Sequence, residues 1–167
     1  MVRYGAAALL AGLLCAVSVA SAQNKIAHDK WEGFAIRKPE GAFDRCVLYN
    51  RAIGAISISP YEMLGISRDA AGHVGLLVFY TPSTLAREKD IPVVLKLDDH
   101  PPVTLTGRAI SDFHIGVDGP LGAPVLAMLR TARRIEVSAE GHVIRFDVTD
   151  VGGALQTLSE CVKANAR

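Results

Sequence analysis

The sequence has little of what would mark a nucleic-acid interface or a zinc enzyme. Its 167 residues carry 18 Lys and Arg against 17 Asp and Glu, which gives a formal net charge of +1. A chain without a basic excess has no long-range attraction for phosphate backbones. The five histidines form neither an H-x-x-x-H nor an H-E-x-x-H motif. We therefore expect no nucleic-acid partner and no metal.

Redox, hydrolase and nucleotide-binding motifs are missing as well. The chain contains no C-x-x-C pair, no G-x-S-x-G elbow, no phosphate-binding loop and no dinucleotide fingerprint. The sequence predicts no cofactor and a protein that is not an enzyme. Hydrophobic residues nevertheless make up 50% of the chain, which is enough for the core of one domain.

The first part of the chain has the layout of a secretory signal peptide. Arg3 precedes an apolar run over residues 6–17, and small residues follow the run. Ala20 and Ala22 occupy the −3 and −1 positions of an A-x-A cleavage site before Gln23. The run is shorter than the roughly 20 apolar residues that a spanning helix needs. We predict cleavage after Ala22, no membrane span in the mature chain, and a periplasmic or secreted product.

Cleavage leaves two cysteines, Cys46 and Cys161. An even cysteine count in an oxidising compartment predicts a disulfide between them. The alternative is a reactive thiol, which needs a neighbouring base; no histidine lies near either cysteine in the sequence. We expect residues 23–30 to be a flexible lead-in and residues 31–167 to form a single domain.

The pattern of apolar residues predicts a β-rich domain of the α+β class. Short strands alternate with clusters of Gly, Pro and Asp, which is typical of an antiparallel sandwich or a barrel-like sheet. The expected strands cover residues 31–37, 43–51, 55–59, 73–81, 91–97, 103–110, 134–139 and 142–148.

The last two strands form the clearest hairpin. With Glu140 and Gly141 as its loop, one register sets apolar residues opposite each other on one face and opposite charges on the other. The predicted pairs are Val137 with Ile144, Ile135 with Phe146, Glu136 with Arg145, and Arg134 with Asp147.

A helix is predicted on each side of this hairpin, the second at the C-terminus. In the first, Pro124 lies in the first turn, and the apolar face consists of Leu121, Val125, Met128 and Leu129. In the second, Asp150 is the expected N-cap. The apolar stripe of the second helix consists of Val151, Ala154, Leu155, Leu158, Cys161 and Val162. Cys161 is therefore expected to face the core.

Four groups of residues are candidate sites, and each has a simpler structural explanation. The Asp-Asp-His run at 98–100 is a possible metal site or a solvated turn. The Asp-Phe-His run at 112–114 would need a serine for a triad. Gly152 and Gly153 offer an anion site or tight helix packing. An anion could be bound by Arg130, Arg133 and Arg134, or their charges could simply stabilise the end of the first helix. We assign no catalytic, metal or binding residue from these patterns.

The chain resembles a known family in its layout. A signal peptide, a strand beginning with Trp31 and a strand carrying Cys46 precede a C-terminal segment FDVTDVGGALQTLSECV at 146–162. In these features it is similar to the invasion-associated locus B (IalB) family and its small exported relatives in alphaproteobacteria. The resemblance implies a β-rich domain exported by a bacterium, and some members of the family are linked to host-cell invasion. It implies no catalytic residues.

Three functions are compatible with these observations. We expect a non-catalytic envelope or secreted domain that binds an unknown envelope or host protein. The first alternative is a small-ligand carrier with an apolar cavity between sheet and helices. The second is an exported hydrolase with a dispersed site around His100 or His114.

Overall fold

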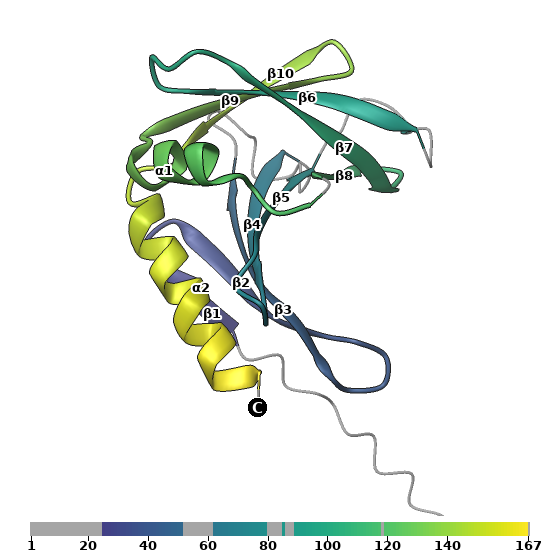
Figure 1. Cartoon of the computed structure of the whole chain (residues 1–167), viewed down its shortest axis with the longest axis vertical. Helices are drawn as coiled ribbons and strands as arrows, with labels where there is room; N and C mark the ends of the chain where they lie inside the picture. Colours follow the sequence, from purple (N-terminus) through teal and green to yellow (C-terminus); the bar gives the residue numbers. More distant parts are fainter. Residues whose placement is uncertain (1–24, 52–61, 80–84, 86–88, 118, 167) are drawn as a thin grey trace, which may run out of the picture.

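The structure is a computed structural model that describes residues 25–51, 62–79, 85, 89–117 and 119–166. Within them the chain forms an antiparallel sheet of ten strands and two helices (Figure 1). The strands are β1 (Lys25–His28), β2 (Trp31–Arg37), β3 (Phe43–Arg51), β4 (Met63–Asp69), β5 (Val74–Phe79), β6 (Asp90–Leu97), β7 (Val103–Ser111), β8 (His114–Val117), β9 (Arg134–Ala139) and β10 (His142–Asp147). The helices are α1 (Ala123–Thr131) and α2 (Val151–Asn165). This confirms the α+β class with its second helix at the C-terminal end.

The sheet is open, with β1 and β10 as its two edges. The strand order is β1-β2-β3-β4-β5-β8-β7-β6-β9-β10, and every neighbouring pair is antiparallel. Figure 1 shows β6, β7, β9 and β10 lying across one end of the molecule, while α2 runs alongside β1 and β2. The sheet therefore bends strongly, and its concave side holds the core.

The sequence pattern located most strands but missed three. The bounds of β2, β3 and β9 are those predicted, whereas β1, β4 and β8 were not expected. The prediction of a flexible lead-in is wrong for Lys25–His28, which pairs along its length with β2. Strand β4 has four consecutive buried residues and β8 is only four residues long, so neither shows the apolar alternation that identifies a strand. The predicted strand at 55–59, the cleavage site at Ala22 and Gln23, and residues 1–22 lie outside the described residues.

The β9–β10 hairpin has the predicted register in all four pairs. Arg145 Nε donates to Glu136 Oε2 at 2.9 Å, so the first charged pair is an ion pair. The expected ion pair of Arg134 with Asp147 is wrong. The Asp147 carboxylate instead accepts hydrogen bonds from Lys30 Nζ at 2.7 Å and from the Thr149 N–H at 3.0 Å. It therefore links the hairpin to the β1–β2 turn.

Replacing Asp147 by Asn is expected to make the stability of the domain less sensitive to acid. Hydrogen bonds from Lys30 and Thr149 hold the pKa of Asp147 well below its ordinary value of 3.8. Since the folded-state pKa is the lower one, this stabilisation is present above the unfolded-state pKa and is lost as the pH falls towards the folded-state value. Urea unfolding between about pH 5 and pH 2 measures the loss. An equal loss in the wild type and Asp147→Asn would contradict the assignment, and Lys30→Met should reproduce part of the effect.

Helix α2 covers the inner face of the first strands through the predicted apolar stripe. All six residues of the stripe are buried, Cys161 among them. Cys46 on β3 faces the helix and forms a disulfide with Cys161, with 6.2 Å between the two Cα atoms. The predicted pairing is therefore present, and it joins positions 115 residues apart.

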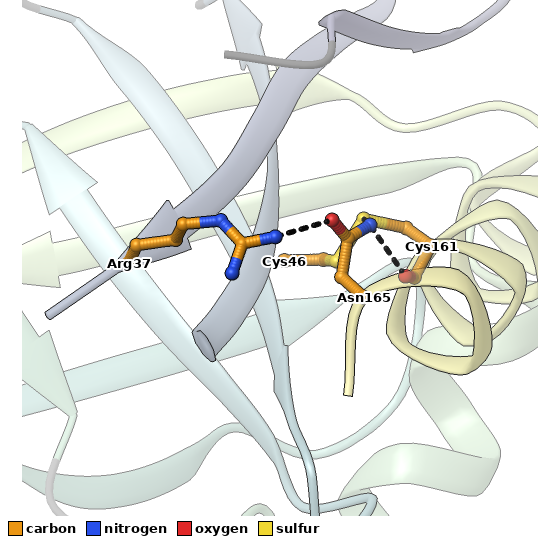
Figure 2. The surroundings of a disulfide bond; sticks show 4 residues. All are labelled: Arg37, Cys46, Cys161 and Asn165. Atoms are coloured by element: carbon orange, nitrogen blue, oxygen red, sulfur yellow. Dashed lines mark hydrogen bonds between the residues drawn. A yellow bond between two sulfur atoms is a disulfide. The ribbon is translucent and has the colours of Figure 1, made fainter. Parts of the chain in front are cut away.

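The last turn of α2 is also tied to β2 beside this disulfide. Figure 2 shows Asn165 beside the disulfide, with its side-chain oxygen directed at the guanidinium of Arg37. Asn165 Nδ2 donates to the Cys161 carbonyl at 2.9 Å, and Arg37 Nη2 donates to Asn165 Oδ1 at 3.4 Å. The C-terminal end of the helix is thus tied to the sheet by one covalent and one polar contact, and the bond from Asn165 to Cys161 orients the amide within the helix.

The start of α2 differs from the sequence-based expectation. Asp150 occupies the N-cap position, but its φ of 62° is left-handed and its side chain makes no capping hydrogen bond. Its Oδ2 lies 2.7 Å from His28 Nε2 instead, which ties the helix to β1. A Cβ at residue 153 would overlap the imidazole of His28, so glycine is required there. Gly152 and Gly153 thus serve close packing, the simpler of their two predicted roles.

Candidate functional site

The two faces of the first strands have different surroundings. Residues that point to the inner face, such as Cys46, Leu48 and Ile66, are completely buried below α2 and the bent end of the sheet. The residues between them point to the opposite side, which we call the outer face. Tyr49 and Leu77 lie on the outer face because they alternate with the buried positions.

The outer face contains a hollow of about 650 Å³ over β3, β4, β5 and β8. We call it the sheet hollow. Its floor contains small residues in adjacent strands, Ser67, Gly75 and Gly116, with Leu77 beside them. Ser67 pairs with Gly75, and Leu77 pairs with Gly116, so the register brings these small residues together. A glycine inside a strand costs about 0.5–1 kcal/mol relative to alanine, so the floor is obtained at some expense of stability.

A row of rings forms one end of the sheet hollow. The ring centroids of Tyr49 and Phe79 are 5.1 Å apart in an edge-to-face arrangement, and those of Phe79 and His114 are 3.9 Å apart. Phe34 continues the row, 6.1 Å from Tyr49. Burial raises the pKa of Tyr49, although the charge of Arg45 opposes this shift. The row therefore offers a continuous, mostly apolar wall.

Tyr49 also separates the sheet hollow from a second hollow of about 690 Å³. The second hollow extends over β1, β2 and β3, and its lining includes Lys25, Lys30, Glu32 and Asn50. Lys25 Nζ lies 3.2 Å from Glu32 Oε2, and Lys30 Nζ is engaged by Asp147. Lys25, Glu32 and Lys30 are thus already paired within the chain, and Asp29 is the remaining charged residue among the described residues of the lining.

An ion pair and a histidine–carboxylate contact form the other end of the sheet hollow. Arg45 Nε donates to Asp44 Oδ2 at 2.7 Å. The imidazole Nδ1 of His73 lies 3.0 Å from Asp69 Oδ2, and the His73 N–H donates to Asp69 Oδ1 at 2.9 Å. Burial raises the pKa of Asp69, but the two hydrogen bonds from His73 outweigh it and the net shift is downward. This end of the hollow therefore offers both hydrogen-bond donors, on Arg45, and acceptors, on Asp69.

The structure brings one serine to His114, as the triad hypothesis required. Ser111 Oγ lies 2.8 Å from His114 Nδ1, and it also accepts a hydrogen bond from the Phe113 N–H at 3.3 Å. Burial lowers the pKa of His114, so the imidazole is neutral at pH 7. Asp112, the acidic residue of the same run, accepts a hydrogen bond through its main-chain oxygen from the Leu85 N–H, at 3.1 Å. The serine–histidine contact closes the turn between β7 and β8.

The run at 98–100 forms the turn that was its simpler explanation. The Asp98 carboxylate accepts hydrogen bonds from the N–H groups of Arg133 and Arg134, the shortest at 2.8 Å. It therefore fixes the start of β9. Among the residues that the structure describes, no three potential metal ligands gather at one place.

Of the residues of the sheet hollow discussed above, sequence reasoning singled out only His114, and for a different role. Tyr49, Phe79 and Gly75 lie in segments that were interpreted only as strands, and Gly116 lies in a strand that was not expected. No local signal marks them, because they become neighbours only through the register of four strands. The one available sign was glycine inside an apolar strand, as in the segment VGLLVF of β5.

No family model and no curated protein matches the sequence. Among solved structures, the crystal structure of invasion associated protein B from Bartonella henselae is similar to this chain with a TM-score of 0.62. The match covers 84% of this chain and 97% of that one, at 13% sequence identity. The two proteins share a fold. This confirms, for the fold, the resemblance that the C-terminal segment and the overall layout indicated. No helix in the described ranges is long and apolar enough to cross a membrane.

Proposed function

We propose that this protein is an exported, non-catalytic domain that binds a protein or another component of the bacterial envelope through the sheet hollow. The main support for this proposal is the sheet hollow, which lies on the face opposite α2 and combines an aromatic wall with charged side chains. The buried disulfide and the shared fold support export, since disulfides persist in oxidising compartments.

The small-ligand carrier has less support. It requires an apolar cavity between sheet and helices, and that space holds packed side chains, among them Trp31, Leu48, Phe146 and Leu158, which are completely buried. The hollows described above open on the outer side of the sheet instead.

The hydrolase also has less support, although Ser111 and His114 are in contact. Ser111 Oγ is engaged by the Phe113 N–H within the same turn, which is a structural role for this hydroxyl.

The name of the Bartonella henselae protein links that protein to invasion. A role of the present chain in host contact is a proposal that rests on the shared fold alone.

A photo-crosslinking amino acid at position 110 tests the proposed function in the organism that makes the protein. Ile110 lines the sheet hollow and is 60% exposed, whereas Val143 on β10 is 48% exposed at the far edge of the sheet. We expect a defined adduct from position 110 and none of that mass from position 143. The absence of an adduct at position 110, or the same adducts from both positions, would contradict the proposal.

A further inference from the structure

The floor of the sheet hollow contains two glycines that packing within the chain explains only in part. At Gly65 a Cβ would lie 2.8 Å from the ring of Tyr49, and at Gly107 it would lie 2.6 Å from Ile115, so packing within the chain explains both glycines. At Gly75 a Cβ would meet only the Ser67 hydroxyl, at 3.1 Å. At Gly116 its nearest neighbour would be an exposed Ile110 methyl, at 3.2 Å.

Glycine inside a strand often marks a close approach by a ligand or another backbone. A Cβ at position 75 or 116 would need a shift of only a few tenths of an ångström from Ser67 or Ile110, so packing within the chain explains these glycines less fully than Gly65 and Gly107. An occupant of the hollow would explain the rest. The occupant would rest on the backbone of β5 and β8, next to Phe79.

The occupant cannot be recognised by strand addition. The hollow lies on the face of the sheet, over strands whose backbone groups are already bonded to neighbours on both sides. An extended peptide that adds a strand needs a free sheet edge, and the edges here are β1 and β10. Recognition in the hollow therefore depends on side chains and on shape.

The side chains favour a neutral ligand with one apolar face and many hydroxyl groups. The rings of Tyr49, Phe79 and His114 provide the apolar wall. The acidic and basic side chains that line the other end are one guanidinium, Arg45, and one carboxylate, Asp69, so neither sign of charge is in excess. Each is already engaged, Arg45 by Asp44 and Asp69 by His73. Asp44 takes up two of the five N–H donors of Arg45. A hydroxyl group both donates and accepts hydrogen bonds, and so complements such a mixed set.

From this combination we propose that the sheet hollow binds sugar units of a neutral glycan, with the C–H face of a ring against the aromatic row and its hydroxyls at Arg45, Asp69 and His73. The volume of about 650 Å³ lies within the range of small-molecule sites. This inference rests on the proposed function, because it assigns a chemical class to the component bound at that surface.

The test is a titration followed by NMR on the oxidised, isotopically labelled protein. Maltotetraose, cellotetraose and chitotetraose serve as neutral probes, and tetragalacturonate serves as the acidic counterpart. We expect at least one neutral probe to give saturable shifts of the Gly75 and Gly116 amide signals, with no shift at Gly141 in the distant hairpin. Gly75→Ala combined with Gly116→Ala should weaken this binding at least tenfold. Val143→Ala is the matched control and should leave it unchanged.

Three results would overturn the inference. They are no saturable shift with any neutral probe in the millimolar range, unchanged affinity in the double alanine variant, and tighter binding of the acidic probe than of every neutral one. The amide spectrum of the variant shows directly whether it is folded. If crosslinking at position 110 succeeds while all neutral probes fail, the glycan inference is wrong and the proposed function stands with a protein partner. If both experiments fail, the proposed function is wrong as well.

Discussion

Replacing both Cys46 and Cys161 by alanine is expected to lower the free energy of unfolding by about 4 to 5 kcal/mol. The disulfide closes a loop of 115 positions, and in the chain-entropy model a loop of this size restricts the unfolded chain by that amount. Single domains typically have a stability of about 5 to 15 kcal/mol, so the variant should be marginally folded. Urea unfolding of the oxidised wild type and of the variant measures the difference.

Reduction provides the control for this prediction. The reduced wild type should unfold at nearly the same urea concentration as the double alanine variant, because both lack the same restriction of the unfolded chain. Both cysteines are almost fully buried, so the two proteins differ only by small changes in packing. A difference of less than about 1 kcal/mol between oxidised and reduced wild type would show that the disulfide does not have this effect.

Gly33→Ala is expected to destabilise the domain by about 3 kcal/mol or more. A Cβ at this position would overlap the carbonyl oxygen of Val47 and would lie 2.9 Å from the Cα of Leu48. These are backbone atoms of β3, which pairs with β2 at this point. They cannot move aside without separating the two strands. Thermal unfolding followed by circular dichroism measures the loss.

Gly75→Ala is the matched control, because it is the same substitution in another strand of the same sheet. Its Cβ would meet only the Ser67 hydroxyl, at 3.1 Å. Alanine is more favourable than glycine inside a strand and offsets the contact with Ser67, so we expect a change within about 1 kcal/mol. Similar losses in the two variants would show that close approach of the backbones at Gly33 is not the cause.

The parts of the fold that could be predicted are those with a local pattern. The apolar stripe of α2 repeats with the helical period, so its buried face and the position of Cys161 follow from the sequence. The register of the β9–β10 hairpin follows from its short loop, which fixes the pairing of the residues on either side.

The parts that could not be predicted depend on strands far apart in the sequence. Asp147 contacts Lys30, and Asp150 contacts His28, since β1 lies beside the start of α2. Strand β1 has only four residues, and its sequence KIAH shows no pattern that predicts either contact. The same applies to the sheet hollow, which exists only once the strands around β5 are in register.

The contacts of α2 with the first strands have a consequence for the order in which the chain folds. The disulfide and the contact between His28 and Asp150 join positions 115 and 122 residues apart. A ribosome makes β1 to β4 long before α2, so the inner face of these strands, with Leu48 and Ile66, has no cover during synthesis. This face can therefore be covered only after α2 has been made, and the disulfide can form only from that point on.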